Sequence, residues 1–124
     1  FSLLDPFCGG GTIPMEACSI LGSDAGTVVG CDRSEAVVKG ARANADAAKE
    51  MFQGFNPPTF QHIGAQGVDR HFEKSTFDAV ITNPPWGVRL SKDDDLIKLY
   101  RGFLYAVSPI VKPGGKVVVM VQRC

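Results

Sequence analysis

Short apolar runs alternate with amphipathic segments along the whole chain, and this alternation constrains the fold more than any other feature of the sequence. Strands are predicted at the apolar runs 1–4, 27–31, 59–63, 77–82 and 116–121. Helices are predicted where apolar residues recur at helical spacing, over 12–21, 34–48 and 93–107. Parallel strands need crossover connections, so the alternation predicts a parallel sheet flanked by helices. Right-handed crossovers make this a doubly wound α/β fold.

The size and composition fit one globular domain. The chain has 124 residues, 44% hydrophobic, and its 13 basic residues balance 13 acidic ones. A net charge of zero excludes a uniform basic surface for gripping nucleic acid. No apolar run approaches the roughly 18 residues of a membrane span, so no membrane partner is expected. The scattered cysteines and histidines have no metal-ligand spacing, so no metal is expected, and the expected location is a reducing compartment, the cytoplasm or the nucleus.

The first predicted strand ends at an acidic residue and a glycine cluster, in the sequence Asp5-Pro6-Phe7-Cys8-Gly9-Gly10-Gly11-Thr12. Glycines at this position allow a tight turn and let a ligand approach the backbone. A phosphate-binding P-loop is excluded because no lysine precedes Lys39. The spacing also departs from the Gly-x-Gly-x-x-Gly dinucleotide pattern. Asp5 would repel a pyrophosphate and suits a ligand with a cationic group, and Thr12 is predicted to cap the following helix.

Asp32 ends the second predicted strand, about twenty residues beyond the glycine cluster. A carboxylate there can accept hydrogen bonds from the two hydroxyls of a ribose. Taken alone, Asp32 could equally cap a helix that begins near Ser34. Its position after the glycine cluster favours the ribose interpretation.

The most specific motif, Asn83-Pro84-Pro85-Trp86, follows the fourth predicted strand. Two consecutive prolines hold the backbone in a rigid, extended turn. The Asn83 amide oxygen and the Pro84 carbonyl then offer two converging acceptors, suited to a planar amino group, and Trp86 offers a flat face on which a base can stack. All these motifs lie at the carboxyl ends of strands, where doubly wound sheets bind ligands.

In this order, the motifs resemble those of class I S-adenosylmethionine-dependent methyltransferases that methylate exocyclic amino nitrogens. Residues 4–17 and 83–90 are most similar to the THUMP-domain-associated RNA guanine-N2 methyltransferases, the UPF0020-type methylase domain. The resemblance implies the strand order 3-2-1-4-5-7-6. It also implies that residues 1–124 are a partial methyltransferase domain, without the N-terminal helix, the last two strands and the RNA-binding THUMP module. The edge of the fifth strand would then be exposed.

The resemblance further implies that S-adenosylmethionine binds along the strand ends and leaves as S-adenosylhomocysteine. The expected cofactor-binding residues are Asp5, Phe7, Cys8, Gly9, Gly11, Thr12, Asp32, Arg33, Ala65, Gln66 and Asn83. The expected catalytic residues, which would hold the target base, are Asn83, Pro84, Pro85 and Trp86. The family usually has an acidic residue after the third strand, bonded to the adenine amine. This chain lacks it, and either Gln66 or Asp69 is expected in its place.

The expected activity is methyl transfer to an exocyclic amine of a nucleic-acid base, with guanine N2 in tRNA or another structured RNA favoured. Related pockets serve adenine N6, cytosine N4 and protein glutamine, and these remain alternatives. A non-catalytic RNA-binding or scaffold subunit is the alternative of another class, suggested by the missing acidic residue. Because the net charge is zero, the RNA is expected to be gripped by a module outside this chain. A protein subunit that activates the enzyme is another candidate partner.

Overall fold

The computed structural model of the chain describes residues 1–85 and 93–121. Within them, one parallel sheet has the strand order β3-β2-β1-β4-β5. The strands are β1 (Leu3–Asp5), β2 (Val28–Asp32), β3 (Thr59–His62), β4 (Phe77–Thr82) and β5 (Val111–Val119). The helices are α1 (Thr12–Leu21), α2 (Glu35–Met51) and α3 (Asp93–Val107), with short 3-10 helices η1 (Gly22–Asp24), η2 (Ala65–Arg70) and η4 (Ser108–Ile110). The predicted doubly wound α/β fold is confirmed.

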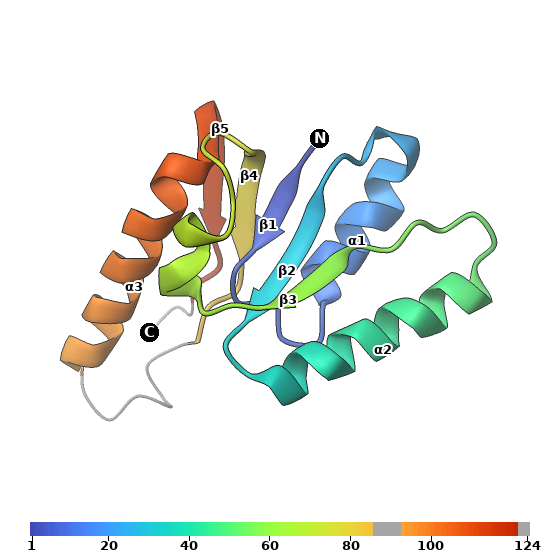
Figure 1. Cartoon of the computed structure of the whole chain (residues 1–124), viewed down its shortest axis with the longest axis horizontal. Helices are drawn as coiled ribbons and strands as arrows, with labels where there is room; N and C mark the ends of the chain where they lie inside the picture. Colours follow the sequence, from blue (N-terminus) through green and yellow to red (C-terminus); the bar gives the residue numbers. More distant parts are fainter. Residues whose placement is uncertain (86–92, 122–124) are drawn as a thin grey trace.

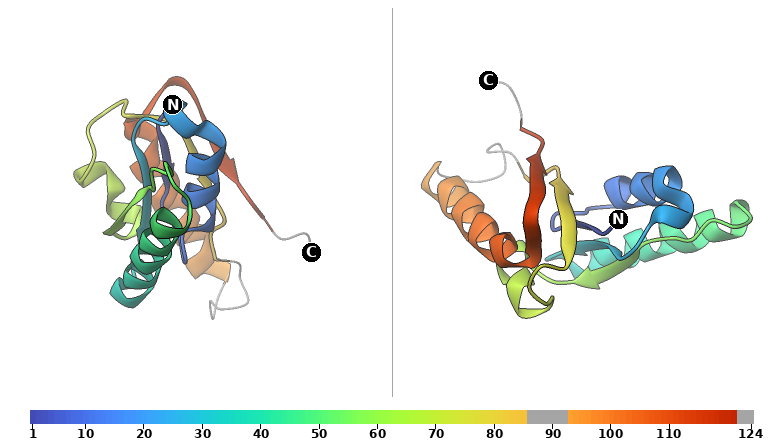
Figure 2. Two further views of the ribbon diagram at one scale, coloured as in Figure 1. Left: turned by 90° about the vertical axis from the view of Figure 1, so that its right-hand side faces the viewer. Right: turned by 90° about the horizontal axis from the view of Figure 1, so that it is seen from above.

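The path of the chain places the helices on opposite faces of the sheet. The strands run outward from β1 to β3, and the chain then returns to place β4 on the other side of β1. As a result, α1 and α2 cover one face, whereas η2 and α3 cover the other (Figure 1, Figure 2). The strand order reverses between β1 and β4, so the loops after these two strands diverge and leave space between them.

Side chains on the two faces of the strands form separate parts of the core. Phe77, Phe103 and Val107 are buried between the sheet and α3. Val38 and Phe60 are buried between the sheet and α2. Each fully buried aromatic or branched side chain contributes about 1.5–3 kcal/mol relative to an exposed one, so both faces hold the sheet in place.

Local sequence signals explain most helix boundaries. The Ser34 hydroxyl accepts a hydrogen bond from the Val37 N–H at 3.3 Å and caps α2, as predicted. Gly22 ends α1, also as predicted. The prediction for Thr12 was wrong, because Gly11 occupies the cap position at φ 91° and Thr12 is the first helical residue. None of the helices in residues 1–85 and 93–121 is long and apolar enough to cross a membrane.

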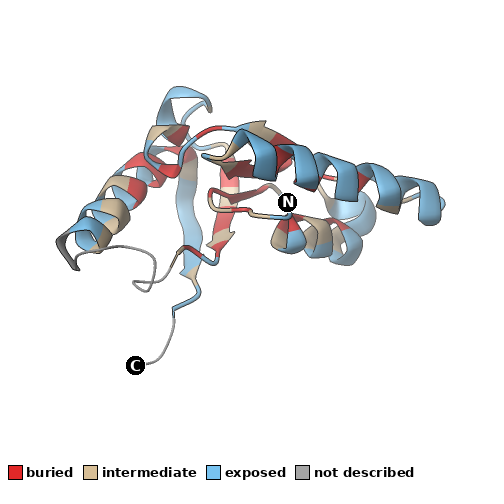
Figure 3. Ribbon diagram, turned by 90° about the horizontal axis from the view of Figure 1, so that it is seen from below, coloured by how far each residue is buried: buried red, intermediate tan, exposed pale blue. Residues whose placement is uncertain are grey.

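The fifth strand is longer and less regular than predicted. Val111 pairs with Phe77 and Lys116 pairs with Ala79, so the segment 112–115 bulges out of the ladder opposite a single residue of β4. This segment is the predicted Lys-Pro-Gly-Gly turn, now found inside the strand. Beyond it, β5 is mostly exposed, including Val118 (Figure 3).

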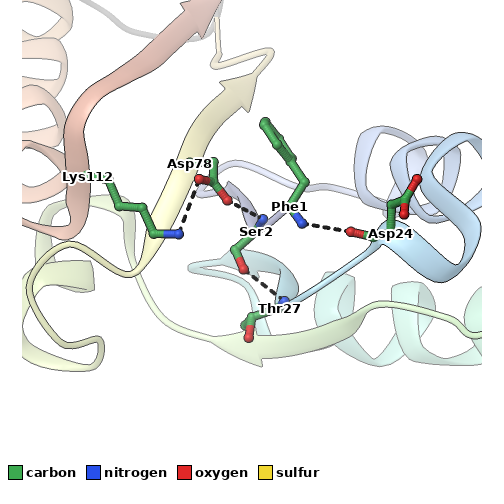
Figure 4. A network of polar contacts seen from close by, with 6 residues as sticks. All are labelled: Phe1, Ser2, Asp24, Thr27, Asp78 and Lys112. Carbon is green, nitrogen blue, oxygen red and sulfur yellow. Dashed lines mark hydrogen bonds and ion pairs between the residues drawn. The ribbon is translucent and has the colours of Figure 1, made fainter.

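A polar network ties the strands together at their amino ends (Figure 4). The Asp78 carboxylate accepts a hydrogen bond from the Ser2 N–H at 2.7 Å and lies 3.2 Å from the Lys112 ammonium. These contacts hold the pKa of Asp78 below its usual value. The Ser2 hydroxyl in turn accepts from the Thr27 N–H at 3.0 Å. Polar side chains therefore brace the end of the sheet that lies away from the predicted site residues.

Candidate active site

The carboxyl ends of β1, β2 and β4 meet at one edge of the sheet, where a cavity of about 530 Å³ opens. This volume lies within the roughly 300–1,000 Å³ range of small-molecule sites. The cavity brings together these residues that the sequence predicted: Phe7, Gly9, Asp32, Arg33, Ala65, Gln66, Asn83 and Pro85. A second cavity, of about 590 Å³, lies at the other end of α3 near Ser75 and Pro109 and contains none of the predicted residues.

Asp32 joins two loops at the end of β2. One carboxylate oxygen accepts a hydrogen bond from the Gly9 N–H at 3.2 Å, and the other accepts from the Ser34 N–H at 2.9 Å. A carboxylate offers about four acceptor positions, so others remain for a ligand. The two interpretations of Asp32, as a residue at a helix start and as a ligand for hydroxyls, are therefore compatible.

Gly9 and Gly11, in the loop after β1, differ in whether the structure leaves space for a side chain. Gly11 has φ 91°, and a Cβ added there would lie 2.6 Å from the Phe60 ring, so backbone conformation and packing both require glycine. Gly9 also has a positive φ, 53°, but an added Cβ would have no atom within 4 Å. Because Gly9 lines the cavity, it is the position at which a ligand can approach the backbone closely.

Asp5 is 1% exposed and is not among the residues that line the cavity. Its Oδ1 atom accepts hydrogen bonds from the Thr82 hydroxyl and, at 3.1 Å, from the Phe7 N–H. Burial and, to a smaller extent, the nearby Asp32 carboxylate raise the pKa of Asp5 to about 6, although both hydrogen bonds oppose the shift. A buried carboxyl group beside a second carboxylate favours a ligand that brings positive charge.

The remaining predicted residues of this loop lie beside the cavity rather than on it. Cys8 is buried, and its N–H donates to the Cys31 carbonyl at 2.8 Å. Burial raises the pKa of both thiols to about 12, so neither is a reactive thiolate. Thr12 is exposed at the start of α1. The Gly10 carbonyl accepts from the Asn44 side chain at 3.0 Å, which fixes the loop to α2.

The Asn-Pro-Pro segment leaves β4 on the opposite side of the cavity. Asn83 is exposed, Pro84 is buried and Pro85 is half-buried. No hydrogen bond joins the Asn83 amide or the Pro84 carbonyl to any other residue of 1–85 or 93–121. The Pro85 carbonyl, by contrast, accepts from the Tyr100 hydroxyl at 3.2 Å. Trp86 lies outside the described residues, so its predicted contact with a base stays a prediction.

The first turns of α3 supply a wall of the cavity that the sequence analysis missed. Asp95, Lys98 and Leu99 line it. A signal was available, because a helix that begins shortly after β4 must start near the ends of the same strands.

The loop after β3 closes another side of the cavity. Gln66 lines it, and its side chain packs against α3 so closely that a Cβ on Gly102 would lie 2.8 Å from it. Of the two residues considered for the adenine contact, Gln66 is on the cavity and Asp69 is not. The Arg33 carbonyl lies 2.9 Å from His62 Nε2, which links the loop after β2 to β3.

The chain is similar to known methyltransferases. Residues 1–123 match UPF0020, described as the RMKL-like methyltransferase domain. The tRNA (guanine(6)-N2)-methyltransferase of Thermus thermophilus is 35% identical over 98% of this chain and 34% of its own length. The tRNA (guanine(10)-N2)-dimethyltransferase of Methanothermobacter thermautotrophicus is 33% identical over 93% of this chain and 31% of its own length. The chain therefore spans about a third of the length of these curated relatives.

Solved structures share the fold. A putative rRNA-methylase from Clostridium thermocellum superposes with a TM-score of 0.72 at 18% identity, over 98% of this chain and 59% of that chain. The fold of this chain therefore also occurs in a protein of quite different sequence.

Proposed function

The chain belongs to UPF0020, the family of RMKL-like methyltransferase domains, and we propose that it methylates the N2 amine of guanine in tRNA with S-adenosylmethionine. The printed activities of the two curated relatives support guanine N2 and tRNA. The observation that carries the proposal is the cavity itself. On one side it is lined by the Asp32 carboxylate and by Gly9, whose backbone a ligand can approach. On the other side lies the Asn83 side-chain amide, which has no hydrogen-bond partner within 1–85 or 93–121.

The residues after β1 and β2 fit the cofactor. We assign Asp32 to the ribose hydroxyls and Gly9 to close contact with the methionine part. Asp5 acts through its negative charge, which favours the sulfonium and the ammonium group. Gln66 is assigned to the adenine amine, with Phe7, Arg33 and Ala65 around it. When bound, the cofactor supplies a methyl group already activated by the sulfonium.

The Asn-Pro-Pro segment is assigned to the target amine. The Asn83 amide oxygen and the Pro84 carbonyl each accept one N–H of the exocyclic amine, which turns the nitrogen lone pair toward the methyl group. The methyl group supplied by the cofactor would go to the amine nitrogen with S-adenosylhomocysteine as the leaving group, and the nitrogen would release one proton to solvent. Alignment contributes most of the rate in this scheme, so no dedicated base is required. Trp86 is assigned to stacking on the base, which would have to flip out of a helix.

We assign most of the tRNA binding to a part of the protein outside this chain. Thirteen basic and thirteen acidic residues give no net attraction to a polyanion. A separate RNA-binding module would supply that attraction, and an activating subunit is a further candidate partner.

Analysis of the modified nucleoside tests the proposal. The complete natural protein is incubated with unmodified tRNA and methyl-labelled cofactor, and the RNA is digested to nucleosides. We expect labelled N2-methylguanosine, with the dimethylated form quantified beside it. Label in N6-methyladenosine, N4-methylcytidine or protein glutamine would contradict the guanine assignment. No transfer and no cofactor binding would favour the non-catalytic alternative.

The variant Asn83→Ala tests the role of the segment. Loss of a contact made in the transition state lowers kcat by about 100-fold or more. Cofactor binding, measured by calorimetry, should stay unchanged because the assigned cofactor contacts lie mainly on the other side of the cavity. The matched control is Asn56→Ala, an exposed asparagine in the loop before β3. Activity of Asn83→Ala within about threefold of the wild type would exclude the assigned role.

A further inference from the structure

The Asn-Pro-Pro segment is held from its two ends. Pro84 and Pro85 have no N–H, so these two residues can be anchored only through their carbonyls and side chains. At its start, the Thr82 hydroxyl bonds to Asp5, and the Thr82 carbonyl accepts from the Met120 N–H at 2.9 Å. These contacts fix the point at which the segment leaves the sheet.

At its far end, the contact comes from Tyr100 on α3. The tyrosine hydroxyl donates to the Pro85 carbonyl at 3.2 Å. Tyr100 is half-buried, and Phe103, three residues further along the helix, is 1% exposed in the core. Since a tyrosine side chain has few rotatable bonds, the packed helix determines where this hydroxyl lies.

A restraint at Pro85 also acts on the residue before it. Two backbone torsions, φ and ψ of Pro85, separate the Pro84 and Pro85 carbonyls, and the proline ring fixes φ at about −65°, so only ψ remains variable between them. Fixing the Pro85 carbonyl toward α3 therefore limits the directions open to the Pro84 carbonyl. That carbonyl is one of the two acceptors assigned to the target amine.

We infer that Tyr100 is a positioning residue for methyl transfer: its hydrogen bond to Pro85 holds the Pro84 carbonyl and the Asn83 amide in the arrangement that receives the amine. This inference rests on the proposed function of the segment. Tyr100 itself touches neither the amine nor the cofactor in this scheme. Its loss should therefore slow the reaction without weakening cofactor binding.

The chain offers a matched pair of variants for the test. Tyr100→Phe removes only the hydroxyl, and Tyr105→Phe makes the same change at a tyrosine of α3 that is 80% exposed. In the complete natural protein, kcat, KM for tRNA, the Kd for S-adenosylmethionine and Tm are measured for both. For Tyr100→Phe we expect kcat to fall about tenfold, with Kd and KM within about twofold and Tm unchanged. Tyr105→Phe should match the wild type in every measurement.

The outcomes separate this inference from the proposed function. If the wild type makes N2-methylguanosine and Tyr100→Phe keeps kcat within about twofold, the positioning role is overturned while the function stands. If Tm, KM and Kd of Tyr100→Phe change together with kcat, the tyrosine supports the fold generally and the inference is again overturned. A wild type that transfers no methyl group overturns the proposed function and this inference with it.

Discussion

The two sides of the cavity are built differently. On the side of β1 and β2, which we call the glycine side, the main chain is bonded within the protein: the Gly9 N–H donates to Asp32, and the Gly10 carbonyl accepts from Asn44. On the side of β4, the Asn-Pro side, Asn83 is exposed and its amide has no partner within 1–85 or 93–121.

This difference suits two tasks. Polar groups that are satisfied internally keep their positions whether or not a ligand is present, so the glycine side is a preformed shape. Acceptors that are fixed in place but unpartnered can bind an incoming donor without first breaking another bond. Substitutions on the glycine side should therefore affect stability and cofactor affinity, whereas those on the Asn-Pro side should affect the rate.

The largest effect on stability is expected at Gly11. An alanine there would take φ 91° and place its Cβ 2.6 Å from the ring of Phe60, which is 3% exposed and has little room to move. The left-handed backbone costs about 1–2 kcal/mol, and overpacking adds about 1–3 kcal/mol. We expect Gly11→Ala to lower the free energy of unfolding by about 3 kcal/mol in urea titrations.

Gly9→Ala is the control within the same loop. It carries the backbone cost at φ 53° but meets no atom within 4 Å. Its free energy of unfolding should fall by only about 1 kcal/mol, whereas cofactor affinity should fall because the new methyl group enters the cavity. Equal losses of stability in the two variants would contradict the distinction between these glycines.

The second effect concerns Asp5 and depends on pH. Burial raises the pKa of Asp5 from 3.8 to about 6, so between these values the folded protein holds a proton that the unfolded chain has released. Stability from this group is therefore present below about pH 4 and is lost as the pH rises through 6. Two pKa units correspond to about 3 kcal/mol.

Asp5→Asn removes this dependence because the amide is always neutral and its oxygen can still accept from Thr82 and Phe7. The variant should match the wild type at pH 4 and exceed it by about 2–3 kcal/mol at pH 7, measured by urea unfolding at both values. It should bind the cationic cofactor more weakly. The control Asp46→Asn replaces an exposed residue of α2, and its stability relative to the wild type should be the same at pH 4 and pH 7. A difference that does not vary with pH would refute the buried-carboxyl account.

The strand–helix alternation was sufficient to predict the doubly wound α/β class, whereas the strand order was implied by the family resemblance. Valine-rich runs and helical spacing are local signals, and the right-handed crossover rule limits how they assemble. The exceptions are positions where tertiary contacts dominate. Thr12 is not a cap because Gly11 occupies that position, and the Lys-Pro-Gly-Gly turn lies inside β5 because strand pairing continues on both sides of it.

The motifs also predicted most of the residues around the cavity, because each follows a strand and parallel strands end at one edge. What they could not predict is the use of each side chain. In the sequence, Thr82 looks like an ordinary strand residue. In the structure, its hydroxyl donates a hydrogen bond to Asp5 on the neighbouring strand β1. Tyr100 reads as part of an apolar helix face, yet it contacts Pro85. Such roles depend on distances between elements, which spacing along one chain does not contain.

The third effect concerns cofactor affinity: Asp32→Asn tests whether the glycine side does more than keep its shape. An asparagine has one side-chain oxygen, so it can accept from either Gly9 or Ser34 but turns an N–H toward the other. The loss of one charge-assisted hydrogen bond to the ribose should raise the cofactor Kd about tenfold, or about 1.4 kcal/mol.

Asp69→Asn is the matched control, because Asp69 is exposed and does not line the cavity. The cofactor Kd of Asp69→Asn, measured by calorimetry, should equal that of the wild type. A higher Kd would assign the adenine contact to Asp69 instead of Gln66. If Asp32→Asn lowers Tm but leaves Kd unchanged, Asp32 only ties Gly9 to the start of α2. The glycine side would then provide shape alone, and the contacts that select the cofactor would have to lie on the loop after β3 and on α3.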